Sequence, residues 1–349
     1  MSRIDLLRGP GPAKRHNART IAALTGNPGC TRRAVLDAAG VDKPRLAQRI
    51  GFPGRFGQSR FALARGNAFE AMLKADGGAL LRTVLGGVSA SYLDVGEDAD
   101  NTLDARNRRT HELLSADGSA KLLDHPLLTL EVAGQPVYLE PDLIAFQPLG
   151  GRLQVVEIKS FSIIDGQADS AKVSAAAVQA AVYVLALRRL LGPERVSHEV
   201  VLVAPVDFSM SPVAVVLDVR KQLSTLRRQL SRLASVSSLI ASLPPEVSFD
   251  LALSPELLVR SLTALEARYA PECLSTCEMS VYCRSEAAGT TAALGRPVRE
   301  ALGGVSAVAD VLALADGTLA PASDQTEAAA LLRAARRLRD EALPDGALS

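Results

Sequence analysis

Three ionisable residues lie in apolar surroundings in the middle of the sequence, within the segment VYLEPDLIAFQPLGGRLQVVEIK of residues 137–159. Asp142 precedes one apolar run, and Glu157 and Lys159 lie at the end of the next. Two close carboxylates repel unless a cation lies between them, and Mg²⁺ binds one or two carboxylates while keeping several waters. A neighbouring ammonium group can orient a water or offset charge on a phosphate. The pattern indicates a Mg²⁺ or Mn²⁺ site; the alternative is a solvated strand face with a Glu–Lys ion pair.

The elements that must position these residues are two strands joined by a turn. Residues 138–146 are mostly apolar with Pro141 as a break, and residues 153–158 are rich in β-branched side chains. Pro148, Gly150 and Gly151 supply the turn between them.

Side chains alternate between the two faces of a strand. Glu157 and Lys159 are therefore expected on the face of Val155, with Val156 and Ile158 on the other. A closed hairpin places Asp142 beside Glu157.

A long apolar helix is expected after the hairpin, over residues 174–191. Gln179 and Tyr183 are four positions apart on it and share one face. Their apolar neighbours predict that the pair is buried, and a buried polar pair needs hydrogen-bond partners. Before the hairpin, residues 59–85 are predicted to be helical with interruptions at Gly66 and at 77–78. Residues 92–125 are polar, and within them residues 94–109 are predicted to be an exposed loop.

The four cysteines form an uneven set. Cys273, Cys277 and Cys283 have C-x3-C-x5-C spacing, and Cys30 is far upstream. Three thiols within eleven residues predict a ligand set, and four thiolates suit either Zn²⁺ or an iron–sulfur cluster. Structural zinc sites usually use two close pairs, which this arrangement does not resemble.

Taken together, Pro141-Asp142 and Glu157-Ile158-Lys159 resemble the PD-(D/E)xK nuclease superfamily. Within its RecB-like subgroup, a G-x3-[H/E] motif precedes the hairpin and a Q-x3-Y motif follows it, matched here by Gly66 to Glu70 and by Gln179 to Tyr183. The resemblance implies that Glu70, Asp142, Glu157 and the Ile158 carbonyl hold Mg²⁺ or Mn²⁺, that Lys159 positions the attacking water, and that Gln179 and Tyr183 support the site. RecB-like members often carry His where this chain has Glu70.

The cysteine set resembles that of the iron–sulfur nucleases of the RecB/AddB type, including the CRISPR-associated RecB-like exonucleases. In those proteins one N-terminal cysteine and a C-terminal C-x2-C-x5-C triplet hold a [4Fe–4S] cluster. The resemblance implies that Cys30, Cys273, Cys277 and Cys283 hold such a cluster here, with Zn²⁺ as the alternative. This chain departs from the pattern in its first gap, where three residues separate the cysteines.

Composition restricts the possible partners and location. The chain has 349 residues, 48% hydrophobic and 4% aromatic, without tryptophan, so Ala, Leu and Val must fill the core. The formal charge of +1 gives no global basic field, so DNA contacts must come from local patches; the best candidate is the basic stripe within residues 220–232. We expect no apolar run of bilayer-spanning length and recognise no secretory signal. We therefore expect a cytoplasmic protein without a membrane partner.

The expected architecture is α/β, with a restriction-endonuclease-like core in which helices flank a central mixed β-sheet, and with helical N- and C-terminal additions. The predicted parts are a flexible N-terminus over 1–20, a nuclease domain over 21–290 stapled by the cysteines, and a small helical region over 291–349. The resemblance implies a DNase, often acting on single-stranded ends, in DNA repair, recombination or defence, with a protein partner of such a complex. The alternatives are a non-catalytic nucleic-acid-binding or assembly subunit, or a zinc-stapled helical protein that binds a protein partner.

Overall fold

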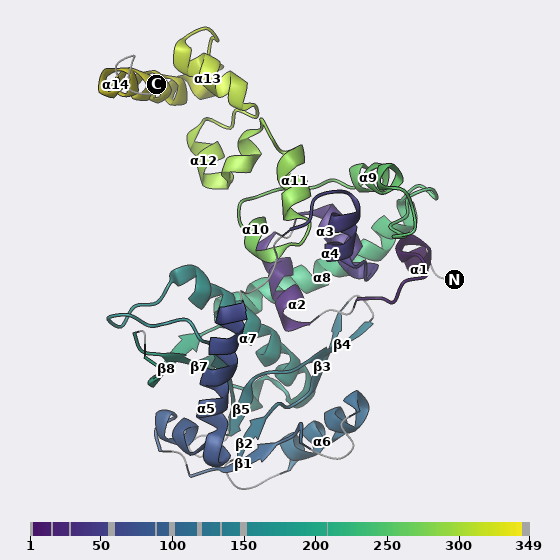
Figure 1. Ribbon diagram of the computed structural model, residues 1–349, viewed down its shortest axis with the longest axis vertical. Coiled ribbons are helices and arrows are strands. Elements are labelled where there is room, and N and C mark those ends of the chain that lie inside the picture. The colour runs from purple at the N-terminus through teal and green to yellow at the C-terminus, as the bar shows by residue number, and fades with distance from the viewer. Residues whose placement is uncertain are drawn as a thin grey trace. The chain divides into compact units, whose positions relative to one another are not determined.

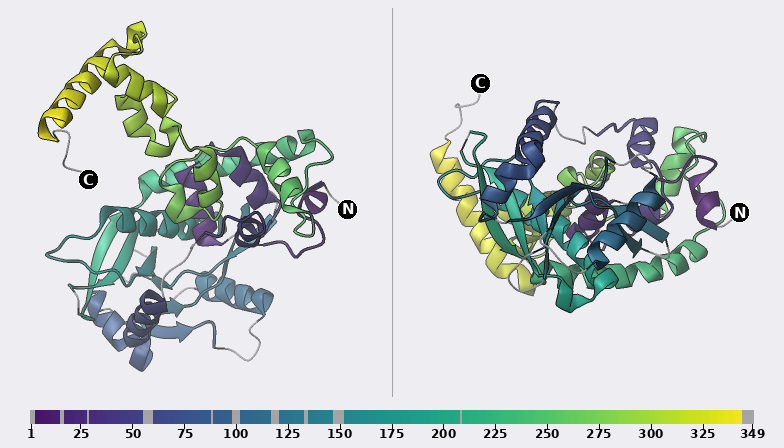
Figure 2. Two further views of the ribbon diagram at one scale, coloured as in Figure 1. Left: turned by 45° about the horizontal axis from the view of Figure 1, so that its top comes forward. Right: turned by 90° about the horizontal axis from the view of Figure 1, so that it is seen from below.

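The chain forms two compact units in the computed structural model (Figures 1 and 2). The helical unit comprises residues 1–11, 29–56 and 244–349, and the sheet unit comprises residues 12–28 and 57–243. This division differs from the predicted boundaries at residues 20 and 290, because two N-terminal segments belong with the C-terminal part. The structure describes residues 3–14, 17–27, 29–54, 60–87, 89–97, 102–116, 121–132, 135–146, 152–207 and 209–343.

A six-stranded mixed sheet forms the centre of the sheet unit, in the order β1-β2-β5-β6-β7-β8. The pairs β1–β2 and β6–β7 are parallel and the other neighbours are antiparallel. The α/β class and the mixed sheet flanked by helices are thereby confirmed. The strands are β1 (Ser91–Asp94), β2 (Lys121–Asp124), β5 (Leu143–Phe146), β6 (Leu153–Ile158), β7 (Glu199–Pro205) and β8 (Pro212–Asp218).

The predicted hairpin is present, with Leu143 of β5 opposite Val156 of β6. Its first strand is shorter than predicted. The segment before Pro141 is a separate strand, β4 (Gln135–Leu139), which pairs with β3 (Leu128–Val132) in a two-stranded sheet. Pro141 has no N–H to donate to a ladder, so the chain changes sheets there. The predicted turn at Pro148, Gly150 and Gly151 lies outside the described residues.

Helices cover both faces of the sheet. Val155 belongs to the apolar core formed with α7, and Val156 belongs to a second core that includes Phe69 and Leu73 of α5. These faces are called the α7 face and the α5 face below. Helix α7 connects the parallel strands β6 and β7, as a parallel crossover requires. The helices of this unit are α2 (Ala18–Gly26), α5 (Arg60–Val84), α6 (Leu103–Ser115), α7 (Ser170–Leu191) and α8 (Arg220–Ser242).

Helix α7 corrects the expectation that no apolar run is long enough to span a bilayer. Among the described residues it is the one helix that is long and apolar enough, by length and composition, to cross a bilayer. Its Ala and Val side chains are mostly buried in the core of the sheet unit, against β3, β6 and α2. Burial on a sheet face accounts for the apolar composition.

The segment predicted as an exposed loop, 94–109, contains the end of β1 and the first part of helix α6. The prediction was wrong from Leu103 onward, because α6 is highly polar and gives little apolar periodicity; residues 98–101 lie outside the described residues. Helix α5 is interrupted as predicted near Gly78, where φ is +74° and a Cβ atom would lie 2.7 Å from the Tyr92 ring. The second predicted interruption, at Gly66, is wrong, because that glycine lies within regular helix.

The helical unit includes the N-terminal segment predicted to be flexible, where residues 3–8 form a helix and Leu7 is fully buried. The region predicted to be helical over 291–349 contains α12, α13 and α14, and α13 packs on α14 around Leu314. The helices are α1 (Arg3–Arg8), α3 (Thr31–Ala38), α4 (Lys43–Arg49), α9 (Pro255–Thr263), α10 (Cys273–Thr276), α11 (Ser280–Glu286), α12 (Arg296–Ala301), α13 (Val308–Asp316) and α14 (Thr326–Ala342).

Candidate active site

Asp142 and Glu157 meet at one edge of the sheet. Asp142 directly precedes β5 and Glu157 is near the end of β6, and the pairing of Leu143 with Val156 makes the two acids neighbours. Because Val155 packs on the α7 face, alternation places Glu157 on that face too. The structure therefore brings together the two carboxylates that the sequence predicted to be adjacent.

Lys159 lies between these carboxylates. Its Nζ forms an ion pair and hydrogen bond with Glu157 and is 3.8 Å from Asp142 Oδ2. The same Asp142 oxygen accepts a hydrogen bond from the backbone N–H of Ile158, at 2.7 Å. The Asp142 carboxylate is thus oriented by the backbone of the strand that carries Glu157.

The environment of Glu157 disfavours its ionised form. Its side chain is 1% exposed, and burial, followed by the nearby charge of Asp142, raises its pKa to about 8. Oε2 is buried and has no hydrogen-bond partner among the described residues. Burial also raises the pKa of Asp142, although Lys159 opposes that shift. A buried carboxylate oxygen without a donor, next to a second acid, is the environment that a divalent cation stabilises.

Glu70 comes to the same edge from α5. Its charge contributes to the raised pKa values of both Asp142 and Glu157, so Glu70 lies close enough to interact with both acids. Its Oε1 accepts a hydrogen bond from Lys74 at 2.5 Å. One turn earlier on the same helix, a Cβ atom on Gly66 would lie 3.5 Å from Ser160 Oγ, so the helix passes close to the segment after β6.

Gln179 and Tyr183 lie on α7, which packs on the same face of the sheet as Glu157. Gln179 Nε2 donates to the Tyr183 hydroxyl at 3.1 Å. Tyr183 is 3% exposed, and burial together with the charge of Glu157 raises its pKa, which keeps the phenol neutral. The predicted i, i+4 pair is therefore present, and Tyr183 is close enough to Glu157 for that charge to affect its pKa.

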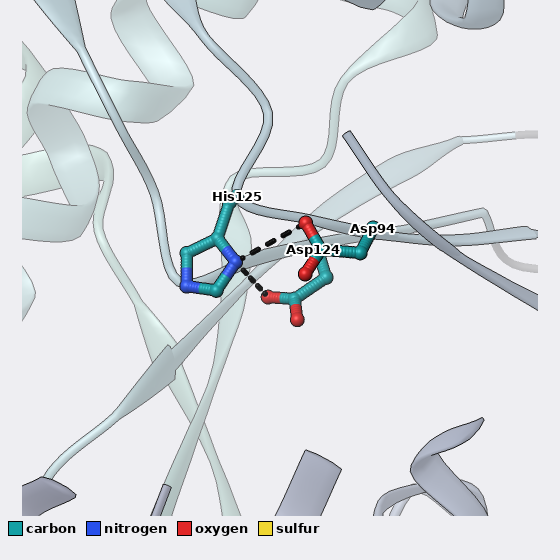
Figure 3. A group of neighbouring side chains, drawn as sticks. All are labelled: Asp94, Asp124 and His125. Carbon is teal, nitrogen blue, oxygen red and sulfur yellow. Dashed lines mark hydrogen bonds and ion pairs between the residues drawn. The ribbon is translucent and has the colours of Figure 1, made fainter. Parts of the chain in front are cut away.

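The sequence reading missed a second group at this edge (Figure 3). Asp94 and Asp124 are register partners at the ends of β1 and β2, and His125 follows directly. Single ligand atoms of these three residues all lie within 4.8 Å of one another. The available signal was that two short apolar runs, SYLD and KLLD, each end in aspartate.

The cysteines lie in the helical unit. Cys30 directly precedes α3, Cys273 opens α10, Cys277 ends it, and Cys283 is on α11. None of the four forms a disulfide, and the last three are buried. Cys30 and Cys277 each contribute to the raised pKa of Cys283, so the distant N-terminal cysteine lies near the triplet, as predicted.

Buried cations accompany these thiols. Burial raises the pKa of Cys283 to about 12, opposed by Arg32, whose Nη1 donates to the Cys283 sulfur at 3.3 Å. Burial likewise raises the pKa of Cys277, opposed by Lys43 and Arg33. A bound metal deprotonates coordinating thiols, and the resulting thiolates would have cations close by. Four cysteine sulfurs are the donor type of both an iron–sulfur cluster and a Zn²⁺ site, although among the described residues the group whose ligand atoms all lie within 4.8 Å of one another is Asp94, Asp124 and His125.

The predicted basic stripe lies on α8. Arg220 is exposed but pairs with Asp218 at 2.5 Å, which reduces its availability to a phosphate. Lys221 and Arg228 are also exposed, whereas the side chain of Arg232 lies outside the described set.

Comparison with known proteins finds no family model that matches the chain and no similar curated protein. Asp142, Glu157 and Lys159 meet at one end of the central strands, and Glu70 is close enough for its charge to affect both acids. Among the described residues, the group whose ligand atoms all lie within 4.8 Å of one another is instead Asp94, Asp124 and His125. Carboxylate oxygens are ligands for a hard divalent cation, and the lysine can interact with an anion.

Proposed function

We propose that the chain is a Mg²⁺- or Mn²⁺-dependent deoxyribonuclease of the RecB-like PD-(D/E)xK class, with a restriction-endonuclease-like core in the sheet unit. The observation that carries the proposal is the buried Oε2 of Glu157, which lacks a hydrogen-bond donor among the described residues, beside Asp142 and Lys159. A purely structural Glu–Lys pair would not need a second buried acid next to it. The two acids raise the cost of burial, and a catalytic metal site explains that cost.

In this proposal Glu70, Asp142, Glu157 and the carbonyl of Ile158 hold the cation. When bound, a divalent cation neutralises phosphate charge and lowers the pKa of a bound water. The N–H of Ile158 keeps Asp142 oriented, and Lys159 remains protonated because the two acids outweigh the effect of its burial and raise its pKa. Its ammonium group positions the attacking water and offsets the charge that develops on the phosphate.

Gln179 and Tyr183 act as supporting residues. The hydroxyl of Tyr183 remains neutral beside Glu157, and the hydrogen bond from Gln179 fixes its position. Substitution at either position is therefore expected to change the orientation of Glu157 rather than remove a ligand.

In the helical unit, we propose that Cys30, Cys273, Cys277 and Cys283 hold a [4Fe–4S] cluster, with Zn²⁺ as the alternative metal. Such a cluster would link residue 30 to the segment 273–283 and so stabilise the helical unit. Cysteines that form no disulfide are compatible with a reducing compartment, and we propose a cytoplasmic location and a role in DNA repair, recombination or defence.

The test is a cleavage assay with protein purified without oxygen. Single-stranded DNA, double-stranded DNA and RNA, each end-labelled, are incubated with Mn²⁺, with Mg²⁺ or with EDTA. The proposal predicts metal-dependent cleavage of DNA, with products that accumulate from the ends. A folded, metal-loaded protein that binds DNA but cuts none of these substrates would instead support the non-catalytic binding subunit.

A further inference from the structure

We propose that Lys74 serves as a fixed side-chain cation in the place where a second divalent ion would otherwise bind beside the candidate active site. This inference rests on the proposed nuclease function. It makes Lys74 a positioning residue and predicts an enzyme that uses one metal ion, since a two-metal site would require a second ion at this edge.

The group formed by Asp94, Asp124 and His125 has the spacing of a metal site (Figure 3). Lys74, however, already contacts it. The Nζ atom of Lys74 is 2.6 Å from Asp124 Oδ1 and 3.1 Å from His125 Nε2. It is also 2.5 Å from Glu70 Oε1. Nζ thus forms hydrogen bonds with Glu70 and His125 and an ion pair with Asp124, so the ammonium group contacts all three side chains.

These contacts determine the protonation of His125. Because an ammonium group only donates, Nε2 of His125 must accept from Lys74, and the ring proton of the neutral imidazole is then on Nδ1. That N–H points to Asp94 Oδ1 at 3.3 Å and to Asp124 Oδ1 at 3.4 Å. A metal at Nδ1 would need the lone pair that this proton occupies. With Lys74 in place, the group is therefore closed to a metal ion.

Asp124 is neutralised in the same way. Its Oδ2 accepts from the hydroxyl of Tyr92, and its Oδ1 is paired with Lys74. Burial opposes the charge of Lys74, but the hydrogen bonds to Asp124 and Glu70 outweigh it and raise the pKa of the ammonium group. Oδ1 of Asp124 and Oε2 of Glu157 are both buried without a hydrogen-bond partner in the described part of the chain, but Asp124 Oδ1 has the Lys74 ammonium 2.6 Å away. Lys74 therefore supplies at Asp124 the positive charge that a metal ion would otherwise supply.

Lys74 also links the filled group to the candidate active site. By holding Oε1 of Glu70, it restricts that carboxylate to binding the proposed ion through its other oxygen. Removing the ammonium would free Glu70 Oε1 and leave Asp94, Asp124 and His125 without their internal cation. The same residues would then form a second site for a divalent ion.

The test is a Mn²⁺ titration of the full-length protein, followed by electron paramagnetic resonance, which counts bound ions without any cleavage. We expect one ion in the sheet unit of the wild type and two in Lys74→Ala. Lys74→Arg, which keeps the charge, and Lys172→Ala, an exposed lysine on α7, are expected to bind one. Adding His125→Ala to Lys74→Ala is expected to return the count to one.

Two ions in the wild type, or an unchanged count in Lys74→Ala, would overturn the proposal. Circular dichroism checks that each variant is folded, and Lys74→Gln serves as a milder substitution if Lys74→Ala does not fold. Failure of the nuclease proposal has a different signature, because wild-type protein would then bind its ion and still leave DNA uncut.

Discussion

Replacing Glu157 by glutamine should make the metal-free protein more stable at alkaline pH while removing a proposed ligand. Burial and the charge of Asp142 raise the pKa of Glu157 from 4.5 to about 8. A raised carboxyl pKa contributes stability that is present below the unfolded value and is lost as pH rises through the folded value. The ionised carboxylate therefore destabilises the sheet unit progressively between about pH 4.5 and pH 8.

The size of the effect follows from the shift. A change from 4.5 to about 8 corresponds to roughly 5 kcal/mol when the group is fully ionised, as an upper limit. Glutamine has nearly the same shape and carries no charge. We therefore expect Glu157→Gln and the wild type to be similar near pH 4.5, and the variant to be more stable by a few kcal/mol near pH 8.5, with ~5 kcal/mol as the ceiling.

Hydrogen exchange on the peptides of β6 and β7, in EDTA, measures this difference. These amides report the opening of the sheet itself, which separates the result from unfolding of the helical unit. Glu112→Gln, an exposed glutamate on α6, is the matched control and should show no pH-dependent difference. A Glu157→Gln protein whose sheet opens more easily than the wild type at pH 8.5 would refute the electrostatic argument.

Three further predictions concern the metal, the cysteines and DNA. Saturation with Mn²⁺ at about 100 times its Kd should stabilise the wild type by about 2.7 kcal/mol in a thermal scan, and the gain should be absent in Asp142→Ala; an equal gain in both proteins would place the ion elsewhere. Cys30→Ser should lower the opening free energy of the helical unit, measured by hydrogen exchange, by up to about 4–5 kcal/mol if the cluster acts as a long-loop cross-link, and should leave the exchange of β6 unchanged. Faster exchange in β6 with no change in α3 would contradict this. The formal charge of +1 predicts a shallow dependence of DNA affinity on salt, and a slope corresponding to about ten released ions would contradict it.

The hairpin with Asp142, Glu157 and Lys159 could be predicted from the sequence because its signals are local. Alternation along a buried strand assigns Glu157 to one face, and adjacency in a hairpin brings Asp142 to it. The same holds for Gln179 and Tyr183, since positions four apart on a helix are neighbours wherever the helix packs.

The group of Asp94, Asp124 and His125 could not be found in that way. Strands β1 and β2 have four residues each and are separated by helix α6, so neither gives a periodic signal. Their aspartates become neighbours only through parallel pairing, which is a long-range contact. Lys74, which contacts this group, lies on α5, and no sequence pattern connects it with β1 or β2.

The division into two units also depends on long-range contacts. Arg32 donates to the carbonyl of Leu262 at 2.9 Å and pairs with Glu286, so the segment of Cys30 joins residues more than two hundred positions away. The sequence correctly grouped Cys30 with the C-terminal triplet. It did not show that these cysteines and the candidate active site belong to separate compact units.

The most direct test of the central claim is the single-turnover rate of DNA cleavage with saturating Mn²⁺ in Lys159→Ala, compared with the wild type and with Lys172→Ala. Lys159 lies between Asp142 and Glu157, so its loss should slow cleavage by at least about 10²-fold, the scale of one lost charge-stabilising group. Lys172→Ala should cut at the wild-type rate. If Lys159→Ala is folded, binds Mn²⁺ and cuts as fast as the wild type, the candidate active site is not where this chain hydrolyses DNA.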